Sequence, residues 1–391
     1  MIRARVVHII TKLELGGAQQ NTLFTVSHLD RNLFEPILIS GEQGILDGEA
    51  RSMGIEFHRV PQMVREIKPW LDARALWALI KILQGIKRRA PQLPVIVHTH
   101  SSKAGILGRW AAHLARCDVI VHTYHGFGFT DRQSAPVRAA YVWAERITKL
   151  VTDAFICVSR ANIERGTKAK VLRPEDTALI RSGIDINEFS SEGKDRLAVR
   201  AAIGVPPDAP LVGMVACFKP QKAPLDFIEV AALVLKDIPE SHFFMAGDGD
   251  LRSEIEAKAR KLGVLERVHL LGWRRDIPEL MAALDVLALT SLWEGLPRVL
   301  PQAMAASRPV VATAVDGSPE AVYEGRTGFL FEPSDKKSAA SKIIELLRNP
   351  RLRQRMGNEA KELVGEFDIA KMVRDQEEFY LKLLDRKLSS S

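Results

Sequence analysis

The chain has 391 residues, of which 46% are hydrophobic and 26% are charged, and its formal net charge is +7 at neutral pH. This length exceeds what one hydrophobic core usually organises, so two domains of ordinary size are expected. No apolar run reaches the roughly 18 residues that cross a bilayer, and the three cysteines lack metal-ligand spacing, which excludes membrane-spanning and disulfide-built classes and favours the cytoplasm.

Five short β-branched apolar runs lie in the first half of the chain, and longer stretches with helical spacing separate them. The helical stretches include Ala73–Arg89 and Val137–Leu150. This rhythm predicts repeated β-α-β units and therefore a parallel sheet. The apolar runs are VVHII (6–10), PILIS (36–40), PVIVHTH (94–100), DVIVHTY (118–124) and AFICVS (154–159).

A second series of the same kind follows and predicts a second parallel sheet. Between the two series, residues 190–210 are polar and then rich in proline, as expected where contacts between domains thin out. We therefore expect domains at 1–190 and 191–366, with residues 367–391 forming a charged amphipathic helix. The runs of the second series are LVGMVA (211–216), HFFMAGDGD (242–250), RVHLLG (267–272), DVLALTS (285–291) and RPVVATAV (308–315).

Paired glycines, Gly16 and Gly17, follow the first run where a helix is expected to begin. They would let backbone N–H groups approach an anion, although a tight turn uses the same residues. The chain lacks the G-x-G-x-x-G pattern, since in GFGFTD (126–131) Asp131 stands where the third glycine belongs. A dinucleotide-dependent oxidoreductase is therefore disfavoured.

Four histidines stand at two predicted strand ends, His98 and His100 in one run and His122 and His125 around the next. If the strands are neighbours the imidazoles could converge, so a metal site must be weighed. No carboxylate or thiolate is close in sequence, which favours hydrogen bonding to substrate or backbone instead of metal binding. His125, which precedes Gly126, is expected to face the cleft.

The first half of the chain is the basic half. Residues 1–190 hold 26 Lys and Arg against 18 Asp and Glu, a net +8, whereas the remainder holds 29 against 30, a net −1. This suggests an anionic partner such as a membrane surface or a phosphorylated acceptor, although solvated faces alone could produce it.

The stretch HTHSSKAG suggests acceptor binding by His100 and Lys103, with helix capping by Ser101 or Ser102 as the alternative. Candidates for a membrane-facing patch are Trp70, Trp110, Trp143, Lys87, Arg88 and Arg89, although core packing is the favoured alternative for the three tryptophans.

In the second domain, Lys219 and Lys222 follow the first run, where lysine near a helix start suggests a diphosphate ligand. The acidic turn at Gly247 suits close approach of a ligand and equally suits an ordinary turn. Glu294 follows the run DVLALTS and is expected at the carboxyl edge of the sheet just before a helix.

Seven motifs occur along the chain, each loose by itself but specific in this order. They are GGAQ (16–19), HTYHG (122–126), RSGID (181–185), KPQKAP (219–224), GDGDLR (247–252), EGLPRVLPQAMA (294–305) and GSPEAV with TGFLF (317–322 and 327–331). In this order they resemble glycosyltransferase family 4 over essentially the whole chain. The resemblance implies an α/β protein of GT-B fold, with two Rossmann-like domains facing across a cleft and a C-terminal helix crossing back to the first domain.

The same resemblance implies a retaining transferase that moves a sugar from a UDP- or GDP-linked donor to a glycan or lipid-linked acceptor. Polysaccharide or lipopolysaccharide assembly at the inner membrane face would be its setting, with no cofactor, no metal and no nucleic acid. The catalytic residues it implies are Glu294, His125 and Lys222. The donor-binding residues it implies are Gly16, Gly17, Lys219, Gly247, Trp273, Arg274, Gly295, Leu296 and Gln302.

This sequence departs from the family pattern at three positions. The family shows two glutamates eight positions apart, the first beside the donor sugar and the second at the ribose; Glu294 fits the first, but residue 302 is Gln. Cys217 stands where the family has arginine, and Ser182 stands where asparagine is usual. Two alternatives remain open: a sugar-nucleotide epimerase or phosphorylase of the same fold, and a non-catalytic protein that binds nucleotide sugars.

Overall fold

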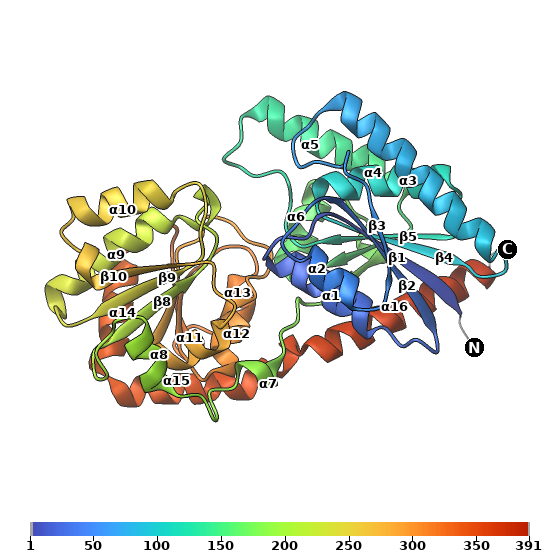
Figure 1. The fold of residues 1–391 in the computed structure, drawn as a ribbon. Helices are drawn as coiled ribbons and strands as arrows, with labels where there is room; N and C mark the ends of the chain where they lie inside the picture. The colour runs from blue at the N-terminus through green and yellow to red at the C-terminus, as the bar shows by residue number, and fades with distance from the viewer. Residues whose placement is uncertain (1–2, 390–391) are drawn as a thin grey trace. The chain divides into compact units, whose positions relative to one another are not determined.

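The computed structural model describes residues 3–389, and its internal contacts divide them into two units. The first unit runs to Gly183 and resumes at Ile369, and the second comprises Ile184–Asp368. The final helix, red in Figure 1, thus belongs to the unit in which the chain begins, as the family resemblance implies.

A seven-stranded parallel sheet forms the centre of the first unit, in the order β3-β2-β1-β4-β5-β6-β7. Its strands are β1 (Ala4–Lys12), β2 (Phe34–Glu42), β3 (Glu56–Arg59), β4 (Val95–His100), β5 (Val119–Tyr124), β6 (Ala154–Cys157) and β7 (Thr177–Leu179). Its helices are α1 (Gly17–His28), α2 (Asp47–Ser52), α3 (Pro69–Arg89), α4 (Ser102–Leu114), α5 (Ala135–Thr148), α6 (Arg160–Lys168) and α16 (Ile369–Ser389), with short 3₁₀ turns at Lys149–Val151 and Pro174–Asp176.

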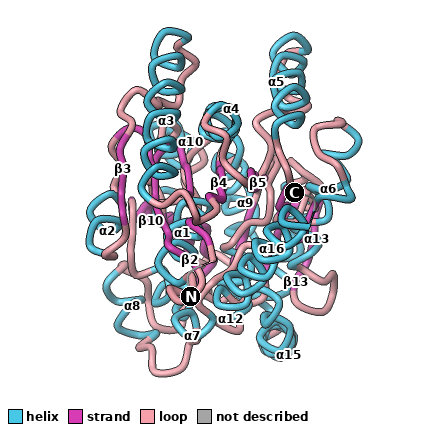
Figure 2. The backbone as a smooth tube through the Cα atoms, turned by 90° about the vertical axis from the view of Figure 1, so that its right-hand side faces the viewer, coloured by secondary structure: helices cyan, strands magenta, loops and turns pink. Residues whose placement is uncertain are grey.

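Both faces of this sheet are covered by helices, which explains why its central strands are continuous apolar runs. On one face, side chains of α3 and α4 pack with strand residues such as Val7 and Val97. On the other face, α16 packs against strand residues such as Val6 and Val121. Figure 2 shows α3, α4 and α5 rising on the same side of the unit.

A six-stranded parallel sheet forms the centre of the second unit, in the order β10-β9-β8-β11-β12-β13. Its strands are β8 (Leu211–Val215), β9 (His242–Ala246), β10 (Val268–Gly272), β11 (Val286–Leu289), β12 (Val310–Thr313) and β13 (Gly328–Phe331). Its helices are α7 (Ile186–Phe189), α8 (Arg196–Ala202), α9 (Pro224–Asp237), α10 (Arg252–Lys261), α11 (Ile277–Ala283), α12 (Val299–Ala305), α13 (Ser318–Ala321), α14 (Lys336–Arg348) and α15 (Pro350–Leu363), with 3₁₀ turns at Pro220–Lys222, Leu265–Arg267 and Val364–Phe367.

The segment at 190–210, which the sequence suggests as the boundary, carries the helix α8 and lies within the second unit. Asp285 holds α8 there, because its carboxylate accepts from Arg196 at 2.8 Å and from Arg200 at 2.9 Å. The division falls seven residues earlier than Ser190, after Gly183. Arg196 and Arg200 in this stretch thus pair with a buried carboxylate of the second unit, and composition alone cannot distinguish such residues from those of a linker.

Each sheet has one switch point, which is the place between two neighbouring strands where the strand order reverses direction. In the first unit this is between β1 and β4, and in the second it is between β8 and β11. Connections leave such a point toward opposite faces of the sheet, so a crevice opens at the carboxyl ends of the two strands, where ligands of α/β proteins bind. These two edges are therefore the places to look for function.

Within residues 3–389, no helix is long and apolar enough to span a bilayer.

Candidate active site

The carboxyl ends of β8 and β11 meet through two loops that are bound to each other. The Gln221 side-chain amide donates to the Trp293 carbonyl at 2.9 Å, and the Leu292 amide donates to the Gln221 carbonyl at 2.7 Å. The Thr290 hydroxyl lies 3.0 Å from the carbonyls of both Lys222 and Ala223. The loop that carries Lys222 and the loop that carries Glu294, which the sequence predicts at separate strand ends, are thus fixed to each other at the carboxyl edge of the sheet.

Lys222 and Glu294 form an ion pair in this corner, although 72 residues separate them. Glu294 is only 8% exposed, and its carboxylate also accepts from the Ser291 hydroxyl at 2.6 Å. The Glu294 amide donates to the Asp316 carboxylate at 2.7 Å. A carboxylate and an ammonium group are therefore held at the switch point of the second sheet. Glu294 is fixed there by hydrogen bonds to both its side chain and its backbone.

Two residues beside this pair adopt the left-handed backbone conformation without being glycine. Ala223 has φ of +43° and Asp316 has φ of +44°, a conformation that costs a residue with a Cβ of order 1–3 kcal/mol. Hydrogen bonds from Thr290 to the Ala223 carbonyl, and from the Glu294 amide to the Asp316 side chain, tie both positions to the pair. Ser291 and Asp316 are supporting residues that the sequence did not single out.

The helix expected directly after Glu294 begins later than predicted. α12 starts at Val299, and the residues between lie in an irregular loop. Gly295 accepts from the Gly317 amide at 3.0 Å, and both Gly295 and Leu296 are buried. Glu294 is accordingly a loop residue whose position depends on Ser291 and Asp316, while Gln302 lies half-buried within α12.

The other residues proposed for the donor lie around the same sheet edge. Lys219 directly precedes the Pro220–Lys222 turn and is half-buried, and Trp273 directly follows β10 and is half-exposed. Arg274 is paired with Asp276 at 2.5 Å, and the hydrogen bonds between them raise the pKa of Arg274. Gly247 has φ of +140°, and a Cβ there would lie 1.9 Å from the Ala216 carbonyl oxygen, so backbone packing alone requires glycine.

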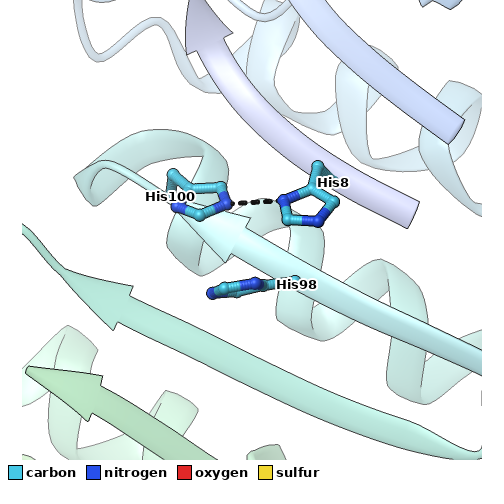
Figure 3. Close-up of side chains that lie close together, drawn as sticks. All are labelled: His8, His98 and His100. Atoms are coloured by element: carbon cyan, nitrogen blue, oxygen red, sulfur yellow. Dashed lines mark hydrogen bonds between the residues drawn. The ribbon is translucent and has the colours of Figure 1, made fainter. Parts of the chain in front are cut away.

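At the switch point of the first sheet, three buried histidines lie together (Figure 3). His8 and His98 are paired across β1 and β4, and His100 follows on the same face. His8 Nδ1 and His100 Nε2 share a hydrogen bond at 3.0 Å, and His100 Nδ1 and His125 Nε2 share one at 3.1 Å. Burial lowers the pKa of His8 to about 3 and the pKa of His98 and His100 well below the usual value, so these rings are neutral.

The predicted convergence of four histidines is thus right for three of them, because His122 lies on the opposite face of the sheet. Its Nδ1 atom bonds the Thr99 hydroxyl at 2.8 Å, as the alternation of side chains along a strand requires. His8 takes the place expected for His122. The sequence signal for it is a histidine inside the buried run VVHII.

The ligand atoms of His8, His98 and His100 lie within 4.8 Å of one another, so the group must be tested as a metal site. Both His98 nitrogens are already bonded, to the Tyr380 hydroxyl at 2.5 Å and the Thr123 hydroxyl at 2.6 Å. A divalent cation would break these bonds and would meet imidazoles only, with no anionic ligand in the group to offset its buried charge. The residues therefore fit a hydrogen-bonded network better than a metal.

A cavity of about 10 Å³ lies beside this network, which is room for one group the size of water. It lies between α1, α16 and the strand ends, and Asn21, His100, His125 and Gln376 are among its lining residues. Asn21 is only 3% exposed, and neither atom of its amide has a hydrogen-bond partner. The lining is rich in hydrogen-bond donors and acceptors and includes one cationic residue, Arg181.

The two remaining first-unit predictions fall on helix starts. Gly16 is the N-cap of α1 and Gly17 its first residue, so a helix does begin there. The Lys103 ammonium is paired with the Asp72 carboxylate at 2.6 Å, and an acceptor anion would have to compete with that partner. The Ser101 hydroxyl does not cap α4; instead the Ala104 amide donates to the Thr11 hydroxyl at 3.1 Å.

Two α/β units of this strand order, each with polar groups collected at its switch point, define a protein of the GT-B fold class. Solved structures agree. Anabaena HepE in complex with UDP-glucose has a TM-score of 0.80 and 22% identity, covering 99% of this chain and 100% of that one. WaaG, a glycosyltransferase involved in lipopolysaccharide biosynthesis, has a TM-score of 0.74 and 20% identity, covering 95% and 98%.

Sequence comparison then gives the family. Residues 15–188 match Glycosyltransferase Family 4, and residues 195–363 match Glycosyl transferases group 1. The chain is 30% identical to the Escherichia coli UDP-Gal:alpha-D-GlcNAc-diphosphoundecaprenol alpha-1,3-galactosyltransferase, over 98% of each sequence. It is 28% identical to the Rhizobium meliloti lipopolysaccharide core glycosyltransferase LpsE, over 73% of this chain and 77% of that one. The chain belongs to the family 4, group 1 glycosyltransferases, and it is a hexosyltransferase.

Proposed function

We propose that this enzyme transfers a hexose from a UDP-sugar to a lipid-linked glycan acceptor, with retention of the anomeric configuration. The observation that carries the proposal is the Lys222–Glu294 pair at the switch point of the second unit. A nucleoside diphosphate needs a cation beside its phosphates, and a sugar needs an acceptor for its hydroxyls. The E. coli relative is named for UDP-Gal and a diphosphoundecaprenol acceptor, which makes UDP-galactose the first donor to test.

In the proposed reaction, the bond between the anomeric carbon and the diphosphate oxygen breaks while the acceptor oxygen attacks from the same face. The acceptor's proton passes to the departing phosphate oxygen, so no protein nucleophile is required. Negative charge grows on the diphosphate, and the fixed Lys222 ammonium stabilises it in the transition state. We expect no metal requirement, because this ammonium supplies the positive charge. Glu294 and His125 would hold sugar hydroxyls in position.

A melting-temperature screen of nucleotide sugars and a transfer assay together distinguish the proposed transferase from an epimerase and from a non-catalytic binding protein. We expect UDP-galactose to raise the melting temperature more than other nucleotide sugars do, because a ligand bound only to the folded state stabilises it. With a lipid-linked acceptor, UDP release should continue in the presence of EDTA. Isomerised donor without acceptor would indicate an epimerase, and binding without turnover would indicate a non-catalytic protein; either result would overturn the proposal.

A lipid-linked acceptor requires the enzyme to approach a membrane, and one face of α3 suits that task. Trp70 and Trp77 are 75% and 60% exposed, and with Arg74, Lys81 and Arg88 they form one stripe by helical spacing. The buried residues of α3, such as Leu79 and Leu83, lie on the opposite side. Tryptophan beside basic residues is typical of helices that lie on anionic membranes.

The structure revises the membrane patch that the sequence suggests. Trp110 is half-buried and donates to the Thr148 hydroxyl at 3.1 Å, so it is a packing residue. Lys87 and Arg89 are paired with Asp118 and Glu56. Trp143 is exposed on α5, which rises on the same side of the unit as α3 (Figure 2).

Replacing Arg74 and Lys81 by glutamine should weaken binding to phosphatidylcholine vesicles that contain phosphatidylglycerol. Each basic group near an anionic surface contributes about 1 kcal/mol, so the pair should lower the partition coefficient roughly 30-fold. Sedimentation with the vesicles measures this. The matched control replaces Lys236 and Arg260, which are exposed on the second unit. Equal losses in both double variants, or no loss in the first, would contradict the proposed surface.

Changing Gln302 to glutamate, which restores the family pattern, should tighten donor binding about fivefold. A charge-assisted hydrogen bond to a ribose hydroxyl exceeds a neutral one by about 1 kcal/mol. Titration calorimetry with the donor measures the change in Kd. An unchanged or weaker affinity would argue against a ribose contact at this position.

A further inference from the structure

The loop that follows β12 is bound to the loop of Glu294 at three points. The two loops leave neighbouring strands, because β11 pairs with β12. The three bonds run from the Thr313 hydroxyl to the Ser291 carbonyl at 2.7 Å, from the Glu294 amide to the Asp316 carboxylate at 2.7 Å, and from the Gly317 amide to the Gly295 carbonyl at 3.0 Å. The conformation of the Glu294 loop therefore depends on the loop beside it.

Asp316 makes its bond from a left-handed backbone, with φ of +44°. Glycine adopts this conformation without steric cost, and aspartate is one of the few other residues that tolerate it. Asp316 lies between β12 and α13 and does not follow a helix. Its bond to Glu294 is thus a contact that glycine could not supply there. Three other described residues with this backbone directly follow helix ends, where it is a common cap; they are Arg116, Lys170 and Ser307.

The Glu294 amide depends on this acceptor because it is largely shielded from water. Glu294 is 8% exposed, and Gly295 and Leu296 after it are buried. A shielded N–H group that loses its partner destabilises the conformation that holds it, and a bond to a carboxylate is stronger than a bond to a neutral acceptor. Removing the Asp316 carboxylate should therefore release the Glu294 peptide to turn toward water.

We propose that Asp316 is a positioning residue that fixes the backbone of Glu294, and thereby the direction in which the Glu294 carboxylate leaves the loop. Ser291 and Lys222 hold the carboxylate itself, but they cannot keep it in place if the peptide that carries it turns. The effect on catalysis rests on the function proposed above for Glu294; the effect on the loop does not.

Hydrogen exchange tests the effect on the loop without reference to activity. Asp316→Gly tolerates the left-handed backbone and removes the acceptor, whereas Asp316→Asn tolerates it and keeps an acceptor oxygen. Exchange at the Glu294 amide, followed in peptides that cover residues 292–296, should be roughly tenfold faster or more in Asp316→Gly than in the unaltered enzyme. In Asp316→Asn it should stay close to the unaltered rate. Equal exchange in the unaltered enzyme and Asp316→Gly would overturn the proposal, whether or not any sugar transfer is found.

Kinetics of the same two variants test the effect on catalysis. A displaced Glu294 should lower kcat roughly 10- to 100-fold in Asp316→Gly, with a smaller change in the donor KM, because positioning matters most in the transition state. Asp316→Asn should keep most of the turnover. Equal kcat values in the two folded variants would contradict a positioning role for the Asp316 side chain.

Ser334→Gly is the matched control, because Ser334 has φ of +67° in an exposed turn between β13 and α14 of the same unit. It changes a left-handed residue to glycine in the same way but lies outside the Glu294 loop. Neither kcat nor exchange over residues 292–296 should change. A loss in this control equal to that in Asp316→Gly would show a general effect of glycine, and the proposal would fail.

Discussion

Replacing Glu294 by glutamine is expected to lower kcat roughly 100- to 1,000-fold, the loss seen when one fixed electrostatic contact at a transition state is removed. The amide has nearly the same shape and can still accept from Ser291, which donates to the carboxylate at 2.6 Å. It cannot balance the Lys222 ammonium or accept a charge-assisted bond from a sugar hydroxyl. The variant thus isolates the charge of Glu294 from its volume.

The measurement is UDP release in the presence of donor and lipid-linked acceptor, compared between the variant and the unaltered enzyme. Glu266→Gln is the matched control, because Glu266 is an exposed acid of the same unit. The control should keep full turnover. If Glu294→Gln kept turnover within a factor of about two while remaining folded, the assignment of this corner as the active site would be wrong.

Most of the fold follows from the sequence because central strands of a parallel sheet are buried on both faces and leave continuous apolar runs. All ten predicted runs contain strands of the structure. The three strands missed among the described residues, β3, β7 and β13, all lie at sheet edges. β3 and β7 are half-buried throughout, so neither shows an apolar run that could be distinguished from a loop.

The site is predictable to the extent that it lies at strand ends. Lys222 and Glu294 each follow a predicted strand, and adjacency of β8 and β11 brings them together. Ser291 and Asp316 support Glu294, but a serine and an aspartate in loops carry no distinctive pattern. Tyr380 bonds His98 across 282 residues of sequence, a contact that depends on how α16 packs and not on local spacing.

Lys222→Met should lower kcat by a similar roughly 100- to 1,000-fold, for the complementary reason. Methionine keeps an unbranched apolar stem but supplies no charge to the departing diphosphate, and such preorganised groups contribute a few kcal/mol to transition-state stabilisation. The Glu294 carboxylate, which is nearly buried, would also lose its cation. Donor KM should rise as well, because the diphosphate is charged before the reaction.

Two comparisons make this prediction specific. Lys236→Met changes an exposed lysine of α9 in the same way and should leave kcat unchanged. In the double variant Lys222→Met, Glu294→Gln, the combined loss should be much smaller than the product of the single losses, since partners that act as a unit are non-additive. Strictly multiplicative losses would show that the two residues act independently, and the ion pair would then be a structural contact only.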